Sequence, residues 1–131
     1  MNRSRMFRGI ILVFAISAIS LAGCTRKINN APVVADKARA ILQTALESWK
    51  KGEKVDSLQS ARPPIYVIDT EWQSGAVLKD YKLVNDGDAK DAQLYCPVKL
   101  TVKEASGREV EREVIYMIST APNQTVARKV F

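Results

Sequence analysis

Apolar side chains in residues 32–51 recur at intervals of three and four, which is the spacing of one helix face. Charged and polar side chains occupy the opposite face. Pro32 suits a first helical turn, Lys50 and Lys51 suit the negative end of the helix dipole, and Gly52 supplies a stop. The pattern therefore predicts a helix over 32–51 with one buried stripe, formed by Val34, Ala38, Ile41, Leu42, Ala45, Leu46 and Trp49.

From residue 65 onward the pattern changes to short apolar runs and alternation, which is typical of strands. In 94–103 every second residue is apolar, so one face of the strand is expected to be buried, with Cys96 among its core residues. Pro97 lies on the other face and lacks an N–H group, which favours an edge position or a bulge. Residues 109–120 return as the antiparallel partner, and we expect Lys99 and Lys103 to pair with Glu109, Glu111 and Glu113.

The remaining elements are shorter. A helical turn is predicted at 55–60, and three further strands at 65–69, 77–85 and 125–131. Asp86, Gly87 and Asp88 indicate a turn between strands. The chain thus predicts one helix, one short helical segment and four to five antiparallel strands.

The first 25 residues have a different pattern. Seventeen uncharged residues run from 9 to 25, at the short end of what a membrane-spanning helix needs, and Arg3, Arg5 and Arg8 precede them. A basic start, an apolar stretch and small residues at its end are typical of a secretory signal peptide. An uncleaved anchor helix is the alternative.

The four residues Leu21, Ala22, Gly23 and Cys24 resemble the lipobox of bacterial lipoproteins. The resemblance implies that the chain is cut between Gly23 and Cys24, that the Cys24 thiol carries diacylglycerol, and that the new amino group is acylated. We therefore predict a signal peptide over 1–23, a polar tether over 24–31 and a single α+β domain over 32–131. The protein would be attached to the cell membrane by lipid, since several acyl chains give stable attachment.

The residue after the cysteine bears on its location. In enteric bacteria an Asp at this position resembles a retention mark for the inner membrane, and this chain has Thr25 instead. We expect the outer membrane, facing the periplasm, if the source is Gram-negative. Because Cys24 would carry lipid, Cys96 has no partner for an internal disulfide.

Charge and composition narrow the possible functions. The whole chain has a net charge of +6, but from Cys24 onward 17 Lys and Arg stand against 14 Asp and Glu, which leaves +3. This small, interspersed excess argues against nucleic acid as a partner. The sequence contains no histidine, which excludes Ser-His-Asp triads and histidine-based metal sites.

A helix followed by a curved sheet looks like the cystatin-like and nuclear-transport-factor-2-like folds. The resemblance rests on the order of elements, with an antiparallel sheet wrapped around a long N-terminal helix. Some members of the second superfamily are enzymes with carboxylates and tyrosines in a pocket. The corresponding candidates here, for proton transfer in a buried site, are Asp69, Asp80, Tyr81, an inward-facing Arg112, and Tyr116. A solvated turn is the alternative for Asp69, and for Arg112 the alternative is a side chain that extends to the edge of the sheet.

Three other features have a plain structural interpretation. The alternate carboxylates at 86–91 resemble a calcium loop, but Lys90 and Pro97 stand where ligands are needed, so no metal or other cofactor is predicted. Trp49 and Trp72 could stack on a ligand, although a core position for Trp49 explains its place on the helix stripe. The lysines at 50, 51 and 54 could contact anionic lipid or a wall polymer, or simply complement the helix dipole.

These observations predict a lipid-anchored cell-envelope protein with a small binding or interaction domain that is not catalytic. Its partners would be the membrane, through Cys24, and an envelope protein or cell-wall component. The alternative is a small pocket enzyme or ligand carrier of the cone-shaped nuclear-transport-factor-2-like fold. A third possibility is an adaptor of a larger envelope assembly, which would have an exposed apolar patch or an unpaired strand edge.

Overall fold

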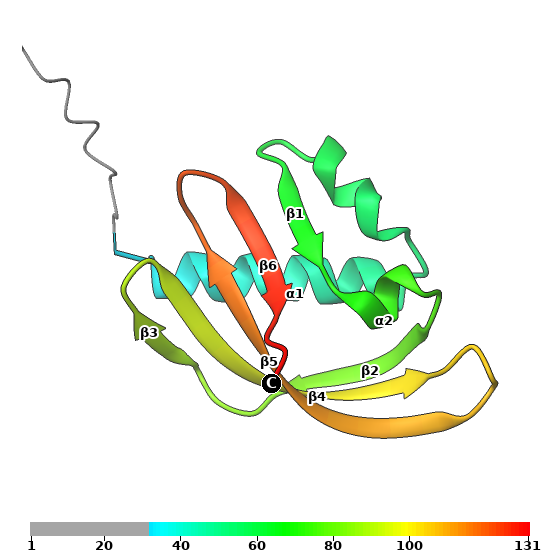
Figure 1. Ribbon diagram of the computed structural model, residues 1–131. Coiled ribbons are helices and arrows are strands. Elements are labelled where there is room, and N and C mark those ends of the chain that lie inside the picture. The colour runs from blue at the N-terminus through cyan, green and yellow to red at the C-terminus, as the bar shows by residue number, and fades with distance from the viewer. Residues whose placement is uncertain (1–31) are drawn as a thin grey trace, which may run out of the picture.

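The computed structural model describes residues 32–131, and the predicted signal peptide and Cys24 lie outside these residues. The described part is an α+β domain in which a curved mixed sheet packs against helix α1, Ala35–Lys50 (Figure 1). A 3-10 segment, η1, covers Val55–Ser60, and a one-turn helix, α2, covers Thr70–Gln73. Within the described residues, no helix has the length and apolar character that crossing a bilayer requires.

The sheet has six strands. Five follow the order β1-β6-β5-β4-β2, and the short β3 pairs with the first part of β4. The bounds are β1 Ile65–Ile68, β2 Val77–Leu83, β3 Asp88–Lys90, β4 Gln93–Lys103, β5 Glu109–Ser119 and β6 Gln124–Arg128. The β4–β5 hairpin is the longest pairing, and both strands bend around the helix (Figure 1).

The core lies between α1 and the concave face of the sheet. Leu42, Leu46 and Trp49 of α1 are fully buried, and they meet alternate side chains of β4 that include Cys96 and Leu100. This packing explains why α1 needs little help at its ends, since Val34 at its N-cap makes no side-chain capping bond. Burial of the apolar stripe supplies most of the helix's stability.

The prediction of a wholly antiparallel sheet is wrong, because β1 runs parallel to β6. In this register Ile68 lies opposite Ala127, which brings Asp69 and Arg128, the next residue of each strand, side by side. The two strands lie side by side in Figure 1, although they are more than fifty residues apart in the chain. Alternation within each strand predicts which face is buried, but it carries no information about a pairing between distant strands.

The expected edge position of Pro97 is also wrong. Pro97 lies in β4, between β5 on one side and β2 and β3 on the other. Its carbonyl accepts a bond of 2.9 Å from the N–H of Val84, in the connection between β2 and β3. In an antiparallel strand the N–H and C=O of one residue point to the same side. The N–H that Pro97 lacks would therefore point toward the place where the strand beside β4 changes from β2 to β3.

The outer face of the hairpin matches the predicted pattern only in part. Lys99 lies opposite Glu113 and Lys103 lies opposite Glu109 in the β4–β5 register. Among the described residues, however, neither lysine comes within ion-pair distance of a carboxylate. These side chains form an alternating charged surface exposed to solvent.

Candidate functional site

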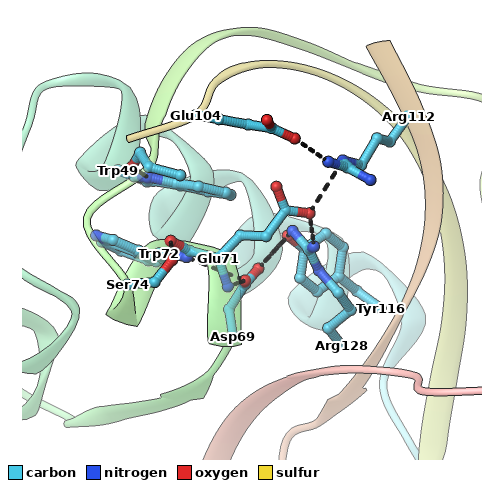
Figure 2. Close-up of polar contacts among 10 residues, drawn as sticks. Trp49, Asp69, Glu71, Trp72, Ser74, Glu104, Arg112, Tyr116 and Arg128 are labelled. Atoms are coloured by element: carbon cyan, nitrogen blue, oxygen red, sulfur yellow. Dashed lines mark hydrogen bonds and ion pairs between the residues drawn. The ribbon is translucent and has the colours of Figure 1, made fainter. Parts of the chain in front are cut away.

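Asp69 is the centre of a polar network between the start of α2 and the inner face of β5 and β6 (Figure 2). It follows β1 and is the N-cap of α2, where its Oδ1 accepts bonds from the N–H groups of Glu71, at 3.0 Å, and Trp72, at 3.3 Å. Aspartate is favoured at an N-cap because its side chain satisfies the free N–H groups of the first turn. Only 1% of Asp69 is exposed, so the solvated turn considered for this residue is wrong.

The second carboxylate oxygen of Asp69 binds two side chains from the neighbouring strands β5 and β6. Tyr116 of β5 donates its hydroxyl to Oδ2 at 2.6 Å, and the Nη2 of Arg128 in β6 lies 2.9 Å from the same atom. Arg128 Nη2 also donates to the Tyr116 hydroxyl, at 3.2 Å. The buried carboxylate thus receives three hydrogen bonds and one ion pair, which compensate for its removal from water.

From Arg128 the network continues outward to solvent. Nη1 of Arg128 pairs with Oε1 of Glu71, and the Nε of Arg112 lies 3.4 Å from that oxygen. Arg112 in turn pairs with Glu104 at 2.5 Å. Figure 2 shows these groups as one chain of contacts leading from Asp69 to Glu104. Among the described residues, Nε of Arg128 is the one buried side-chain polar atom without a hydrogen-bond partner.

The electrostatic setting keeps Tyr116 neutral. Burial raises the pKa of Tyr116, and the charge of Asp69 raises it further against the opposing effect of Arg128. Burial alone would lower the pKa of Arg128, but Tyr116, Asp69 and Glu71 together raise it. The phenol therefore acts as a hydrogen-bond donor at neutral pH, and the guanidinium stays charged.

The structure brings together three of the five candidates from the sequence, namely Asp69, Tyr116 and Arg112. Arg112 is on the concave side of β5, as predicted, because it lies opposite the buried Leu100. Its side chain is 42% exposed and reaches the edge of the sheet. In this half of the hairpin the long strands extend away from α1 (Figure 1).

Asp80 and Tyr81 lie elsewhere, on β2 against α1. The Asp80 side chain is 73% exposed and its Oδ1 is 3.6 Å from the Nζ of Lys50. Tyr81 donates its hydroxyl to Glu47 at 2.6 Å. Burial raises the pKa of Tyr81 to about 12, and the hydrogen bond and charge of Glu47 contribute to the shift. These contacts attach β2 to the helix and do not reach Asp69.

Sequence reasoning missed Arg128 and Glu71. A signal for Arg128 was present, because Gln124, Val126 and Arg128 alternate on the inward face of the last strand. A charged residue on that face needs a buried partner. Glu71 carried no comparable signal, since its role depends on the distant strand β6.

Trp49 and Trp72 stack with ring centroids 5.5 Å apart and planes within 10° of parallel. Each indole N–H donates to a backbone carbonyl, Trp49 to Ala76 at 2.8 Å and Trp72 to Glu53 at 2.9 Å. Both rings are buried, as predicted for Trp49, and Arg128 lies 6.0 Å from the Trp49 ring. The pair therefore fixes α2 against the end of α1, and its ring faces are occupied by each other and by the core.

The other cavities and charged groups lie apart from Asp69. The largest cavity described, of about 670 Å³, is lined by Val33, Asp91, Tyr95 and neighbouring residues at the outer end of the sheet. A second, of about 400 Å³, borders the tryptophan pair at Glu53 and Lys54. Within residues 32–131, no cluster of three or more carboxylates or thiols has a geometry suited to a metal ion.

Cys96 is a free and fully buried thiol, which confirms its predicted core position.

No known family model, curated protein or solved structure matches the chain. The function is therefore inferred from the geometry of the site and from the sequence.

Proposed function

We propose that the protein is a lipid-anchored component of the bacterial cell envelope, attached through Cys24, whose α+β domain acts by binding. The lipobox at 21–24, directly after an uncharged stretch with a basic start, is the observation that carries the anchor. Cell-membrane attachment, with the outer membrane favoured by Thr25, belongs to the same proposal.

The Asp69 network supports a structural role better than a catalytic one. Asp69 and Tyr116 are each 1% exposed, and none of the cavities described above is lined by either residue. General acid–base catalysis requires a substrate within hydrogen-bond reach of the catalytic group. Every oxygen of Asp69 already binds groups of the protein itself, so the network serves to join α2, β5 and β6.

We assign the domain to the cystatin-like or nuclear-transport-factor-2-like type of roll, with α1 as its long N-terminal helix. The curvature of β4 and β5 around α1 supports this assignment (Figure 1). A ligand carrier or enzyme of this type has an open cone. Here Leu42, Leu46 and Trp49 occupy the space between helix and sheet, which favours a binding module over a pocket enzyme.

The anchor is tested by mass spectrometry of the protein purified from membranes. We expect a chain that begins at Cys24 and carries added acyl mass, and a Cys24→Ala variant that is either released or accumulates with its first 23 residues. An unmodified chain that still starts at Met1 would contradict the proposal. Crosslinking in intact envelopes, followed by purification of the lipidated protein, would then identify an envelope partner.

A further inference from the structure

The face of the sheet that points away from α1 carries an apolar surface whose most exposed part lies on β1. Tyr66 and Ile68 of β1 are 41% and 62% exposed. The strand registers extend this surface across the sheet, because Ile68 lies opposite Ala127, Ala127 opposite Met117, and Met117 opposite Tyr95. Residues directly opposite one another in a ladder share a face.

This outer face has two halves of different character. The half that contains Ile68 and Met117 continues through the pair Ile115 and Pro97, and the residues of β1, β5 and β4 in these rows are uncharged. Charged residues lie beside them on the neighbouring segments, because Asp88 of β3 is opposite Tyr95 and the N–H of Lys129, after β6, bonds to the carbonyl of Ile115. The other half, toward the tip of the hairpin, carries the alternating lysines and glutamates described above. Strand and residue spacings give the half that contains Ile68 and Met117 an area of about 300 Å², the size of the largest apolar patch on an ordinary monomer, which is often functional. We call it the outer patch. Tyr66 and Ile68 are its exposed members, and Tyr95, Pro97, Ile115 and Met117 are half-buried.

The described chain begins at the rim of the outer patch. The N–H of Val33 bonds to the carbonyl of Asp91 at 3.2 Å, and Val33 lines the same cavity as Gln93 and Tyr95. Eight residues, 24–31, precede the first described residue. Even fully extended they span less than about 30 Å. A lipid on Cys24 would therefore keep the start of the described chain, at the rim of the outer patch, within about 30 Å of the bilayer surface.

The rim of the patch has the side chains that suit a bilayer interface. The Nζ atoms of Lys90 and Lys129 each lie 5.9 Å from the centre of the Tyr95 ring, and Lys129 lies 5.1 Å from the ring of Phe131, which is 93% exposed. Tyrosine rings settle at the level of lipid headgroups, and lysines extend their amino groups from an apolar surface toward water.

We propose that the outer patch rests on the bilayer that holds the Cys24 lipid, so that the hairpin tip and α1 remain available to envelope partners. This inference depends on the proposed lipid anchor. Area favours lipid over a protein as the occupant, because a stable protein interface needs about 800 Å² from each partner. Contact with lipid only has to orient a domain that its acyl chains already hold at the surface.

The test uses the full lipidated protein in phosphatidylcholine vesicles. One variant, Ile68→Cys, carries an environment-sensitive fluorophore in the outer patch, and the matched variant, Glu111→Cys, carries it on the charged half of the same face. Buried Cys96 should take up no label, which the unsubstituted protein checks. With spin-labelled lipid in the bilayer, we expect quenching at 68 to exceed quenching at 111 by about threefold or more, as for groups that reach the interface.

A second variant separates contact with lipid from an effect of labelling. Adding Met117→Asp to Ile68→Cys should abolish the extra quenching while tryptophan fluorescence stays native. Equal, weak quenching at 68 and 111 in protein that floats with the vesicles would overturn the inference and leave the anchor intact. Protection of 68 from an aqueous quencher without quenching by lipid would also overturn it, because a second copy or another protein would then cover the patch. Failure to float would instead contradict the anchor.

Discussion

The hydroxyl of Tyr116 donates a 2.6 Å hydrogen bond to Oδ2 of Asp69, which lies 47 residues earlier in the chain. The contact joins the central strand β5 to the start of α2, and the parallel pairing of β1 with β6 adds Arg128 to the same oxygen. Without these contacts, β1 would be held to the sheet by a single four-residue ladder. The network therefore holds β1 and α2 against β5 and β6.

Replacing Asp69 by asparagine tests this role. The amide side chain would keep an oxygen for the helix cap but would remove the charge that faces Arg128, leaving a buried guanidinium with Glu71 as its remaining partner. We expect a loss of about 3 kcal/mol in the free energy of unfolding, as for one partner of a buried ion pair. Urea denaturation, monitored by tryptophan fluorescence, measures this loss.

Asp80→Asn is the matched control, because it removes a carboxylate that pairs with Lys50 at the surface. An exposed pair contributes little, so the loss should stay below about 0.5 kcal/mol. Similar losses for the two variants would show that the Asp69 network does not hold the sheet together.

The sequence is sufficient to predict those parts of the fold that depend on neighbouring residues. The helix stripe and the β4–β5 hairpin repeat at the periods of their elements, so the burial of Trp49 and Cys96 follows directly. A signal for the short helix α2 is also present, since Asp69 before Thr70 and Glu71 is an N-cap pattern. Only four helical residues follow it, so the pattern does not distinguish this helix from a turn.

Contacts between distant segments are outside the reach of pattern analysis. The parallel β1–β6 pairing depends on how η1 and α2 direct the chain, and no local signal records it. Consequently, the sequence identifies Asp69 and Tyr116 as separate candidates, but it reveals neither their contact nor the part played by Arg128. Their residue types suggest proton transfer, whereas the geometry shows saturated hydrogen bonding.

The two shifted tyrosines predict a loss of stability at alkaline pH. Burial raises the pKa of Tyr81 to about 12 and also raises that of Tyr116, whereas an unfolded tyrosine has a pKa of about 10. Above about pH 10 the unfolded chain releases protons that the folded chain retains, so the free energy of unfolding falls as pH rises. Below about pH 10, the contribution of the two tyrosines to the free energy of unfolding is fully present.

Urea midpoints measured at about pH 8, 10 and 11 would follow this decline. Tyr81→Phe and Tyr116→Phe should each make it shallower, because each removes one proton whose affinity differs between the two states. Lysines that titrate in this range are common to all three proteins and cancel. Identical slopes for the variants and the unsubstituted protein would refute the linkage.

The thiol of Cys96 should be unreactive in the folded protein. It is fully buried, and burial raises its pKa, so little thiolate is present at neutral pH. Reaction with a small aromatic disulfide should be at least about 100-fold slower in buffer than in urea, since it requires opening of the core. A fast reaction in buffer would mean that β4 opens readily.

Gly87 allows a close approach between the connection after β2 and strand β4. A Cβ at this position would lie 3.0 Å from the carbonyl oxygen of Tyr95 and 3.1 Å from the Leu94 side chain, and its φ is +85°. Gly107 has nearly the same φ, +87°, but its added Cβ would have open space around it. The pair therefore separates backbone strain from crowding.

We expect Gly107→Ala to lower the free energy of unfolding by about 1 kcal/mol, which is the cost of a left-handed conformation. Gly87→Ala should cost at least about 1 kcal/mol more, because a backbone oxygen cannot move aside as a side-chain end can. Hydrogen exchange would locate the damage. The amides of Asp88–Lys90 should exchange faster in Gly87→Ala alone, since relief of the contact requires β3 to move away from β4. Equal losses in the two variants would mean that the approach at Gly87 is loose enough to accept a methyl group.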